Sequence, residues 1–257
     1  MPDTSFTIIT VVFNGADLLP GTVKSVRCQT YPHIEYLIID GGSTDGTLDL
    51  IREHALEMPN LRWVSEKDRG LYDAMNKGLR LATGDFVWFL NCGDHIHSPD
   101  TVEKLAKLSD DTTDVLYGET LLVGSTRQPV GTMSALSTRK LPNQLHWRDY
   151  LYGMLVVHQS FIPRRNLAPE YISNNLCADY DWSIRILKKS RKTVNVHRVL
   201  SEYLMGGMSK QRHWQSLKDR FRIMQQHYGL LLTLLAHTWI LLRAALHWLS
   251  RLGSARY

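Results

Sequence analysis

The sequence predicts an α/β fold with a mostly parallel central sheet flanked by helices. Short runs of β-branched residues alternate with segments of helical spacing from Phe6 to Leu90. The first two runs are stopped by Asn14-Gly15 and by Asp40-Gly41-Gly42, which are turn formers. Polar residues also collect after the ends of the runs. Strand, helix, strand units of this kind build a parallel sheet.

The expected elements follow one another along the chain. Strands are expected over residues 6–13, 35–39, 61–65 and 85–90, and helices over 18–29, 47–55 and 71–82. Beyond them we expect a pair of strands over 115–117 and 120–123, a mobile loop near 139–143, a helix over 178–189 and a strand over 193–199. Gly206 and Gly207 then start a flexible link to the C-terminal part.

The composition is that of a globular protein, with 257 residues, 44% of them hydrophobic and 21% charged. We expect one catalytic domain, over residues 1–210. The three cysteines are far apart and lack the spacing of a disulfide framework or zinc site, which fits a reducing cytoplasm; they are Cys28, Cys92 and Cys177. The N-terminus lacks the basic region and cleavage site of a signal peptide, so nothing there directs the catalytic part to secretion.

Residues 211–257 are predicted to form a basic segment and a C-terminal apolar, amphipathic helix that associates with a membrane or packs. The formal net charge is only +5, but five basic residues crowd before the apolar stretch 229–249: Lys210, Arg212, Lys218, Arg220 and Arg222. This favours an anionic membrane surface over nucleic acid as a partner.

Helical spacing within this stretch gathers polar residues on one stripe: Thr233, His237, Arg243, His247 and Arg251. Trp239 and Trp248 lie elsewhere on the helix. Such a pattern is typical of a helix lying in a membrane interface. The alternatives are a spanning helix, or packing against the catalytic domain or a second subunit.

Several polar segments are predicted to share one edge of the sheet. They follow the carboxyl ends of the strands, at Asn14, Asp40, residues 65–69 and residues 91–94. Open α/β sheets bind ligands at this edge, because loops can aim side chains there without disturbing the sheet. A Rossmann dehydrogenase is excluded, since no Gly-x-Gly-x-x-Gly follows the first strand.

Two aspartates at this edge each allow a structural and a functional interpretation. Asp40 opens the segment DGGSTDGT, which either forms a tight turn before a helix or receives a nucleotide base or ribose. Asp94 ends the segment NCGD, where it is either a turn residue or a ligand of a hard cation that also binds phosphate. Two carboxylates on one edge favour a cation, which a Mg²⁺ or Mn²⁺ diphosphate supplies.

Three segments together resemble family 2 glycosyltransferases. They are TVVFN at residues 10–14, IDGGSTDGT at 39–47 and EKDRGLYDAMNKG at 66–78. The resemblance extends over roughly residues 5–210 and is greatest to bacterial enzymes of colanic acid and other surface polysaccharide assembly. It implies a GT-A fold and an inverting transfer from a nucleotide diphosphate sugar, with UDP-sugars favoured over GDP- and TDP-sugars.

The resemblance also implies roles on the donor side. Asp40 matches the uracil-binding aspartate, and Asp68 matches a second nucleotide contact. Asp94 matches the last residue of the metal-binding Asp-x-Asp-type motif, whose first acidic position is Asn91 here. Asp94 alone would then hold Mg²⁺ or Mn²⁺ with the donor diphosphate and water. Three basic residues near this edge either pair with the diphosphate or are solvated: Lys67, Arg69 and Lys77.

The acceptor side is expected in the later part of the domain. Asp179 and Asp181 open a helix, where acidic residues are ordinarily N-terminal caps. Asp179 nevertheless matches the catalytic base of the family, with Asp181 as the alternative. Such a base takes the proton of the attacking hydroxyl. His158 and Gln159 resemble an acceptor-side pair, although a lone histidine near a strand is often a core hydrogen-bonding residue.

These features predict an enzyme at the cytoplasmic face of the inner membrane, peripherally associated with it and acting on a glycan or polyprenyl-linked acceptor. A homo-oligomer is compatible with the sequence. Two other functions are considered: a sugar nucleotidyltransferase, whose product would keep the nucleotide, and a catalytically silent binding subunit, suggested by Asn91. The four matching aspartates argue against the silent subunit; they are Asp40, Asp68, Asp94 and Asp179.

Overall fold

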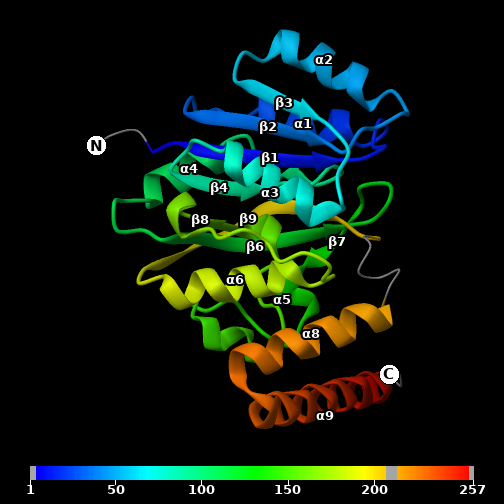
Figure 1. Cartoon of the computed structure of the whole chain (residues 1–257). Coiled ribbons are helices and arrows are strands. Elements are labelled where there is room, and N and C mark those ends of the chain that lie inside the picture. The colour runs from blue at the N-terminus through cyan, green and yellow to red at the C-terminus, as the bar shows by residue number, and fades with distance from the viewer. Residues whose placement is uncertain (1–3, 207–212, 255–257) are drawn as a thin grey trace.

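Two β-sheets meet side by side in the computed structural model, which describes residues 4–206 and 213–254 (Figure 1). The first sheet has the strand order β3-β2-β1-β4, and every pair in it is parallel. Its strands are β1 (Phe6–Val12), β2 (Ile34–Asp40), β3 (Leu61–Ser65) and β4 (Phe86–Phe89). The four expected strands are therefore confirmed to within one residue.

Helices cover both faces of this sheet, because β1 is apolar on both sides. Ile8 and Val12 pack in one core cluster with residues of α1 (Leu19–Arg27), whereas Ile9 packs in the other cluster with residues of α3 (Leu71–Leu81). Buried parallel strands require such continuous apolar runs. The remaining helices of this half are α2 (Thr47–Glu57), which was expected, and α4 (Thr101–Leu108), which was not.

The second sheet has the order β5-β9-β6-β7, and β8 also pairs with β6. Only the β6–β9 pair is parallel. Its strands are β5 (His95–Ile96), β6 (Val115–Val123), β7 (Pro129–Thr132), β8 (Phe161–Pro163) and β9 (Thr193–Leu204). An isolated antiparallel bridge between Phe86 and Arg164 joins the two sheets.

The strand pair expected over 115–117 and 120–123 is wrong, because these residues form the single strand β6. Gly118 lies between the two expected strands, inside β6, where two backbones approach closely: a Cβ there would lie 2.6 Å from the carbonyl oxygen of Arg198. On β9 the irregularity falls at His197, whose φ is 54°. Because the strand passes through it, β9 continues to Leu204 rather than ending at Val199.

The loop near residues 139–143 contains no helix or strand, but its backbone is anchored. The carbonyl oxygen of Pro142 accepts hydrogen bonds from the Tyr117 hydroxyl (2.6 Å) and the Asn195 amide (2.8 Å). The structure therefore gives no support to its expected mobility. Short helical elements surround it: α5 (Met133–Leu136) and the 3-10 helices η1 (Trp147–Tyr152), η2 (His158–Ser160) and η3 (Arg165–Leu167).

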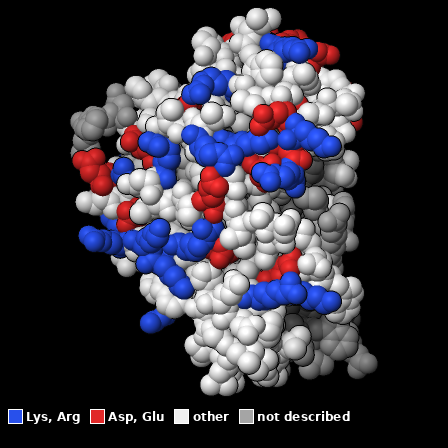
Figure 2. Space-filling view, viewed as in Figure 1, with Lys and Arg blue, Asp and Glu red and all other residues white. Residues whose placement is uncertain are grey.

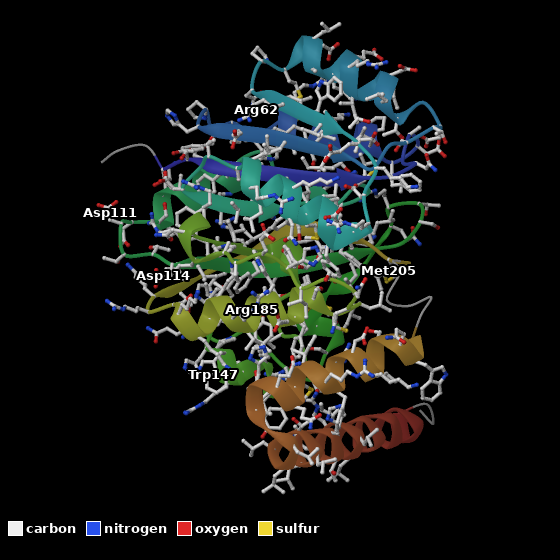
Figure 3. All side chains as sticks on the ribbon, in the orientation of Figure 1. Arg62, Asp111, Asp114, Trp147, Arg185 and Met205 are labelled. Carbon is white, nitrogen blue, oxygen red and sulfur yellow. The ribbon has the colours of Figure 1, made fainter. Side chains whose placement is uncertain are left out.

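The C-terminal helices form the base of the molecule in Figure 1. The expected helix over 178–189 is α6 (Ala178–Lys189); α8 (His213–Tyr228) packs against it, and α9 (Leu230–Ser254) packs on α8. Figure 3 labels Trp147 and Arg185, which lie at this junction; the Trp147 ring stacks on Tyr228 at 5.4 Å. Among the described residues, no helix has the length and hydropathy to cross a bilayer. Gly207, Lys210 and Arg212 lie outside the described residues, as do the side chains of His247, Trp248 and Arg251.

Candidate active site

Asp40 is buried at the carboxyl end of β2, inside a network of hydrogen-bond donors. Its carboxylate accepts from the backbone N–H groups of Gly42 (3.2 Å) and Ser43 (3.1 Å) and from the Ser65 hydroxyl on β3 (2.6 Å). The Ser43 hydroxyl donates to it as well. The network holds the strand-to-helix turn in shape, so Asp40 has a structural role whether or not it also contacts a nucleotide.

Asn14 connects two loops at the same edge. Its φ of 49° lies in the left-handed region, which asparagine tolerates better than most residues. Its Oδ1 accepts from the Thr44 N–H (2.9 Å), and its own N–H donates to the Ser43 hydroxyl (2.7 Å). Asn14 therefore fixes the turn that follows Asp40.

Asp68 and Lys77 form a nearly buried ion pair beside Asp40. The Lys77 ammonium contacts Asp68 at 2.5 Å and Glu66 at 2.9 Å. Burial alone would lower the pKa of Lys77, but its hydrogen bonds to Asp68 and Glu66 outweigh that effect and raise the pKa. Lys77 is thus occupied with carboxylates. The Arg69 side chain is 93% exposed, and its nearest carboxylate is Asp73 at 3.9 Å.

Phe13 is an exposed aromatic surface that the sequence pattern did not single out. It is 66% exposed, although it directly follows the buried strand β1. Gly41 separates it from Asp68: a Cβ on Gly41 would lie 3.3 Å from the Phe13 ring and 2.9 Å from Oδ2 of Asp68. A glycine is therefore required here, and it leaves an open aromatic face with a carboxylate beside it. The sequence could not reveal this exposure, because Phe13-Asn14 has the pattern of a buried strand that ends at a turn former.

Asp94 is a buried carboxylate, with 4% of its surface exposed. Its Oδ2 accepts from the Gln159 side-chain amide (2.9 Å) and its Oδ1 from the Leu204 N–H (3.0 Å). The pKa of Asp94 is raised to about 6, because the effect of burial outweighs the hydrogen bonds from Leu204 and Gln159 and the charge of Arg127, which lower it. The site therefore holds a carboxylate that a cation would stabilise in its charged form.

Asn91, His158 and Asp179 form a row of contacts beside Asp94. The Asn91 side-chain amide lies 3.1 Å from Nε2 of His158. On the other side of the ring, Nδ1 lies 3.4 Å from Oδ2 of Asp179. The Tyr180 N–H donates to Oδ1 of Asp179 (2.9 Å), and the Tyr72 hydroxyl shares its one proton between this oxygen (3.4 Å) and the Leu176 carbonyl oxygen (3.2 Å). The structure therefore brings the expected acceptor-side residues next to the expected metal-binding loop.

Asp181 does not lie in this row, because it is two positions after Asp179 and therefore lies on another face of α6. It pairs with Arg185 at 2.7 Å and with His227 of α8 at 2.7 Å. Burial would raise the pKa of Asp181, but the pairing with His227 and Arg185 lowers it overall. Its contacts describe a structural ion pair at the α6–α8 junction.

Arg127 is a second residue that sequence reasoning missed. It lies in the turn between β6 and β7, has a φ of 64°, and donates to the Gly93 carbonyl oxygen and to His95. Its Nη1 is buried and has no hydrogen-bond partner among the described residues. Arg127 thus supports the loop that carries Asp94. It is distant from that loop in the sequence and belongs to no motif, so no pattern could reveal it.

The residues around Asp94 suit a cation shared with a diphosphate. The buried Oδ1 of Asn91 has no hydrogen-bond partner within the described residues, so an amide oxygen is available in the same turn as Asp94, whose backbone N–H donates to the Asn91 carbonyl oxygen (2.9 Å). Both are hard oxygen ligands of the kind that Mg²⁺ and Mn²⁺ prefer. The described part of the chain contains no cluster of three or more His, Cys, Asp or Glu able to hold a metal alone. Other ligands would have to come from a bound diphosphate and water.

Comparison with known proteins identifies the class of enzyme. Residues 7–169 match the model of the family described as glycosyl transferase family 2. A curated relative is the PGL/p-HBAD biosynthesis glycosyltransferase of Mycobacterium bovis BCG, which is 32% identical over 216 residues, covering 79% of this chain and 78% of the relative.

Solved structures show the same fold at low sequence identity. S. aureus TarS 1-349 in complex with UDP-GlcNAc has a TM-score of 0.68 at 18% identity; the match covers 87% of this chain and 65% of the TarS chain. The mannosyltransferase PcManGT of Pyrobaculum calidifontis, in complex with GDP-Man and Mn²⁺, has a TM-score of 0.62 at 19% identity, covering 97% of this chain and 79% of the other. The expectations of fold and enzyme class are thereby confirmed, and the chain belongs to glycosyl transferase family 2 as a glycosyltransferase with the GT-A fold.

Proposed function

We propose that this enzyme transfers a sugar from a nucleoside diphosphate donor to an acceptor hydroxyl with inversion, using Asp179 as the base. The observation that carries the proposal is that two adjacent residues join two carboxylates: Gln159 binds Asp94, and His158 binds Asp179. Donor-side and acceptor-side groups are therefore neighbours. A transferase needs this proximity, because the leaving group and the attacking hydroxyl meet at one anomeric carbon.

On the donor side, we infer that the nucleotide base stacks on the exposed face of Phe13. Asp68 would then lie beside the base, with Lys77 holding the Asp68 carboxylate in place. Asp40 can reach the nucleotide by exchanging one of its hydroxyl partners, Ser43 or Ser65, for a group of the base. A UDP-sugar is our first choice of donor, and the complexes of TarS with UDP-GlcNAc and of PcManGT with GDP-Man support a donor of this class.

On the diphosphate side, Asp94 and Oδ1 of Asn91 would hold Mg²⁺ or Mn²⁺. A bound cation would stabilise negative charge on the leaving nucleoside diphosphate. The complex of PcManGT with Mn²⁺ supports this choice of metal. Arg69 is exposed at the same edge and can approach a phosphate once a donor is bound.

On the acceptor side, the Asp179 carboxylate receives the proton of the acceptor hydroxyl. As the new bond from the acceptor oxygen to the anomeric carbon forms, the bond to the diphosphate oxygen breaks and the nucleoside diphosphate leaves. Tyr72, Tyr180 and His158 fix the Asp179 carboxylate, which keeps one geometry for proton transfer.

We infer that α9 binds a membrane surface through its outward side. Thr233 is buried and His237 half-buried against α8, so this first part of the polar stripe of α9 faces the protein. The outward side is apolar, with exposed fractions of 48–73% for Leu230, Leu231, Leu232, Leu234, Leu235, Trp239, Leu241 and Leu242. On the surface of a soluble protein, a helix turns its polar side to solvent and its apolar side to the core. A contiguous exposed apolar face such as this one marks an interaction surface.

Charge favours a membrane over a second copy of the chain as the occupant of this face. In Figure 2 the base of the molecule, formed by α9, is mostly white, and a row of basic side chains lies just above it on α8. Lys218 and Arg222 are exposed on α8. Basic residues beside an apolar face match anionic lipids. A domain over residues 1–210 with a membrane-binding unit over 211–257 would place the site at the cytoplasmic face of the inner membrane, near a polyprenyl-linked glycan acceptor. Self-association through α9 is the competing interpretation.

The test is release of nucleoside diphosphate from a panel of nucleotide sugars, in the presence of Mn²⁺ and a membrane lipid extract. Acceptor-dependent release by the wild type, lost in Asp94→Ala and retained in the control Asp111→Ala on an exposed loop, is the expected result. A product that keeps the nucleotide would indicate a nucleotidyltransferase. No release by a folded protein that still binds the nucleotide would indicate a silent binding subunit.

A further inference from the structure

We propose that Asn91 is a positioning residue that fixes the tautomer of His158 and, through it, the orientation of Asp179. The inference rests on the proposed role of Asp179 as the base. It assigns a function to the amide at the one position where the donor-side motif lacks its first acidic residue. Asn91 lies on the loop after β4 and Asp179 at the start of α6, so the contact connects the donor and acceptor sides.

Two contacts on opposite sides of one ring determine where the proton of His158 lies. Nδ1 is 3.4 Å from the Asp179 carboxylate, which in its charged form only accepts hydrogen bonds. A neutral ring satisfies that carboxylate only with its proton on Nδ1. Nε2 is then an acceptor, and the Asn91 amide, 3.1 Å away, presents its Nδ2 donor to it. The reversed amide would place Oδ1 against a lone pair.

An amide at position 91 can donate to His158 through its nitrogen and still present an oxygen on the donor side, whereas a carboxylate can only accept. With Nδ2 directed to His158, Oδ1 of Asn91 remains buried without a hydrogen-bond partner among the described residues. An aspartate at this position would accept from Nε2 and favour a doubly protonated, cationic ring between two carboxylates, so the neutral Nδ1–H tautomer would be lost. The oxygen of the asparagine stays available on the donor side while its nitrogen holds the ring.

The remaining contacts of Asp179 show why the ring matters. Tyr72 and the Tyr180 N–H both donate to Oδ1, whereas His158 is the partner of Oδ2. If the proton leaves Nδ1, Oδ2 loses this donor and the carboxylate can rotate away from the attacking hydroxyl. His158 is itself buried, so water does not readily replace it.

The first test reads the tautomer directly, by ¹⁵N NMR of the full-length, histidine-labelled protein in EDTA. The wild type should show His158 protonated on Nδ1 and not on Nε2. Asn91→Leu, which removes the donor at similar volume, should shift the proton to Nε2 in a substantial fraction of molecules. Asn91→Asp should place a proton on Nε2. The control Asn60→Asp, in a distant turn where Asn60 donates to the Ile34 carbonyl oxygen, should leave His158 unchanged.

The second test separates positioning from donor binding. At saturating Mn²⁺, where excess metal offsets the loss of the proposed Oδ1 ligand, Asn91→Leu should still lower kcat by about 10–100-fold, the range for partners that orient a functional histidine, while the Kd for the free nucleoside diphosphate without metal stays within about 3-fold. A wild-type His158 protonated on Nε2, or a tautomer unaffected by Asn91→Leu, would overturn the inference. The wild-type spectrum decides this even if a variant fails to fold. If no donor is turned over at all, the proposed function fails while the tautomer result still stands.

Discussion

Gln159 donates a hydrogen bond from its side-chain amide to Oδ2 of Asp94 across 2.9 Å, and both residues are buried. Asp94 belongs to the loop that follows the first sheet, whereas Gln159 lies in η2, beside the second. The Leu204 N–H at the end of β9 holds the other oxygen of Asp94. The carboxylate that we assign to the metal is therefore oriented by the way the two sheets meet.

Replacing Gln159 should weaken metal binding more than donor binding. In Gln159→Leu, the buried Asp94 carboxylate loses a donor and the direction imposed on Oδ2. The Mn²⁺ concentration for half-maximal activity should rise by about 10–100-fold, as for other partners that orient metal ligands. Measurement of nucleoside diphosphate release against Mn²⁺ concentration checks this, with Gln225→Leu on the exposed surface of α8 as control. An unchanged Mn²⁺ dependence would remove Gln159 from the site.

The buried charge of Asp94 should destabilise the metal-free protein at neutral and higher pH. Its folded-state pKa of about 6 exceeds the ordinary value of 3.8, so the folded protein binds this proton more tightly than the unfolded one. Its contribution to stability is greatest below the ordinary value and is lost as the pH rises through 6. In EDTA, Asp94→Asn should therefore be more stable than the wild type by on the order of 2–3 kcal/mol near pH 8.

The pH profile of that difference is the decisive measurement. Urea denaturation in EDTA should show the advantage of Asp94→Asn shrinking toward zero near pH 4. The asparagine can keep both contacts, because its oxygen accepts from Leu204 and its amide can face a rotated Gln159. Excess Mn²⁺ should stabilise the wild type and not the variant. A constant difference at all pH values would contradict the raised pKa.

Removing the aromatic face of Phe13 should affect donor binding alone. Stacking of a base on an aromatic side chain contributes about 1–3 kcal/mol, so Phe13→Ala should raise the Kd for UDP by about 5–150-fold. Phe13→Tyr should bind nearly as well as the wild type. Calorimetric titration with UDP measures both, and thermal unfolding should change little because Phe13 is 66% exposed. Equal affinities for wild type and Phe13→Ala would place the base elsewhere.

The first sheet could be predicted almost residue by residue because its signals are local. Each strand is a short β-branched run that ends at a turn former, and β3 (Leu61–Ser65) has the expected bounds. The second sheet depends on contacts between distant segments. Gly118 lies between the two strands that the sequence predicts there, yet it is part of the single strand β6, and the backbone of β9 leaves no room for a side chain at this position. The edge strands of the second sheet, β5 and β7, are too short to show the alternating hydrophobic pattern of a strand.

In the candidate site, too, local motifs could be predicted from the sequence, whereas contacts between distant segments could not. Motif spacing could single out Asp40, Asp68 and Asp94 as candidates, since each lies at or just after the carboxyl end of a strand of the first sheet. It could not identify Arg127, which reaches the Asp94 loop from a hairpin in the second sheet. Nor could it distinguish Asp179 from Asp181, because only the packing of α8 shows that Asp181 has its own cation partners.

The exposed leucines of α9 should govern binding to anionic vesicles. Changing Leu231, Leu235 and Leu241 together to serine should weaken binding to phosphatidylglycerol-containing vesicles by roughly 100-fold, at about 1 kcal/mol for each side chain. A matched control changes exposed leucines elsewhere, Leu56 and Leu108, to serine. Vesicle flotation measures binding, and it should weaken in high salt. Absence of vesicle binding together with a concentration-dependent dimer would indicate that α9 pairs with a second copy.

Asp179 and Asp181 should respond differently to loss of charge. Asp179→Asn removes the proposed proton acceptor but keeps its size, so turnover should fall by about 10²–10⁴-fold while the Kd for UDP stays within about 2-fold. Asp181→Asn should keep most of its turnover and lose about 2 kcal/mol of stability, because charged hydrogen bonds to Arg185 and His227 are weakened. Single-turnover kinetics and urea denaturation measure the two effects.

The pH dependence of stability distinguishes the two aspartates further. The pKa of Asp181 lies below the ordinary value, so the stability that it contributes is present above that value and is lost as the pH falls below it. The stability difference between wild type and Asp181→Asn should therefore shrink as the pH falls below the ordinary value of 3.8. If Asp181→Asn instead abolishes turnover in a folded protein while Asp179→Asn stays active, the base is Asp181, and the α6–α8 junction must open for the acceptor to reach it.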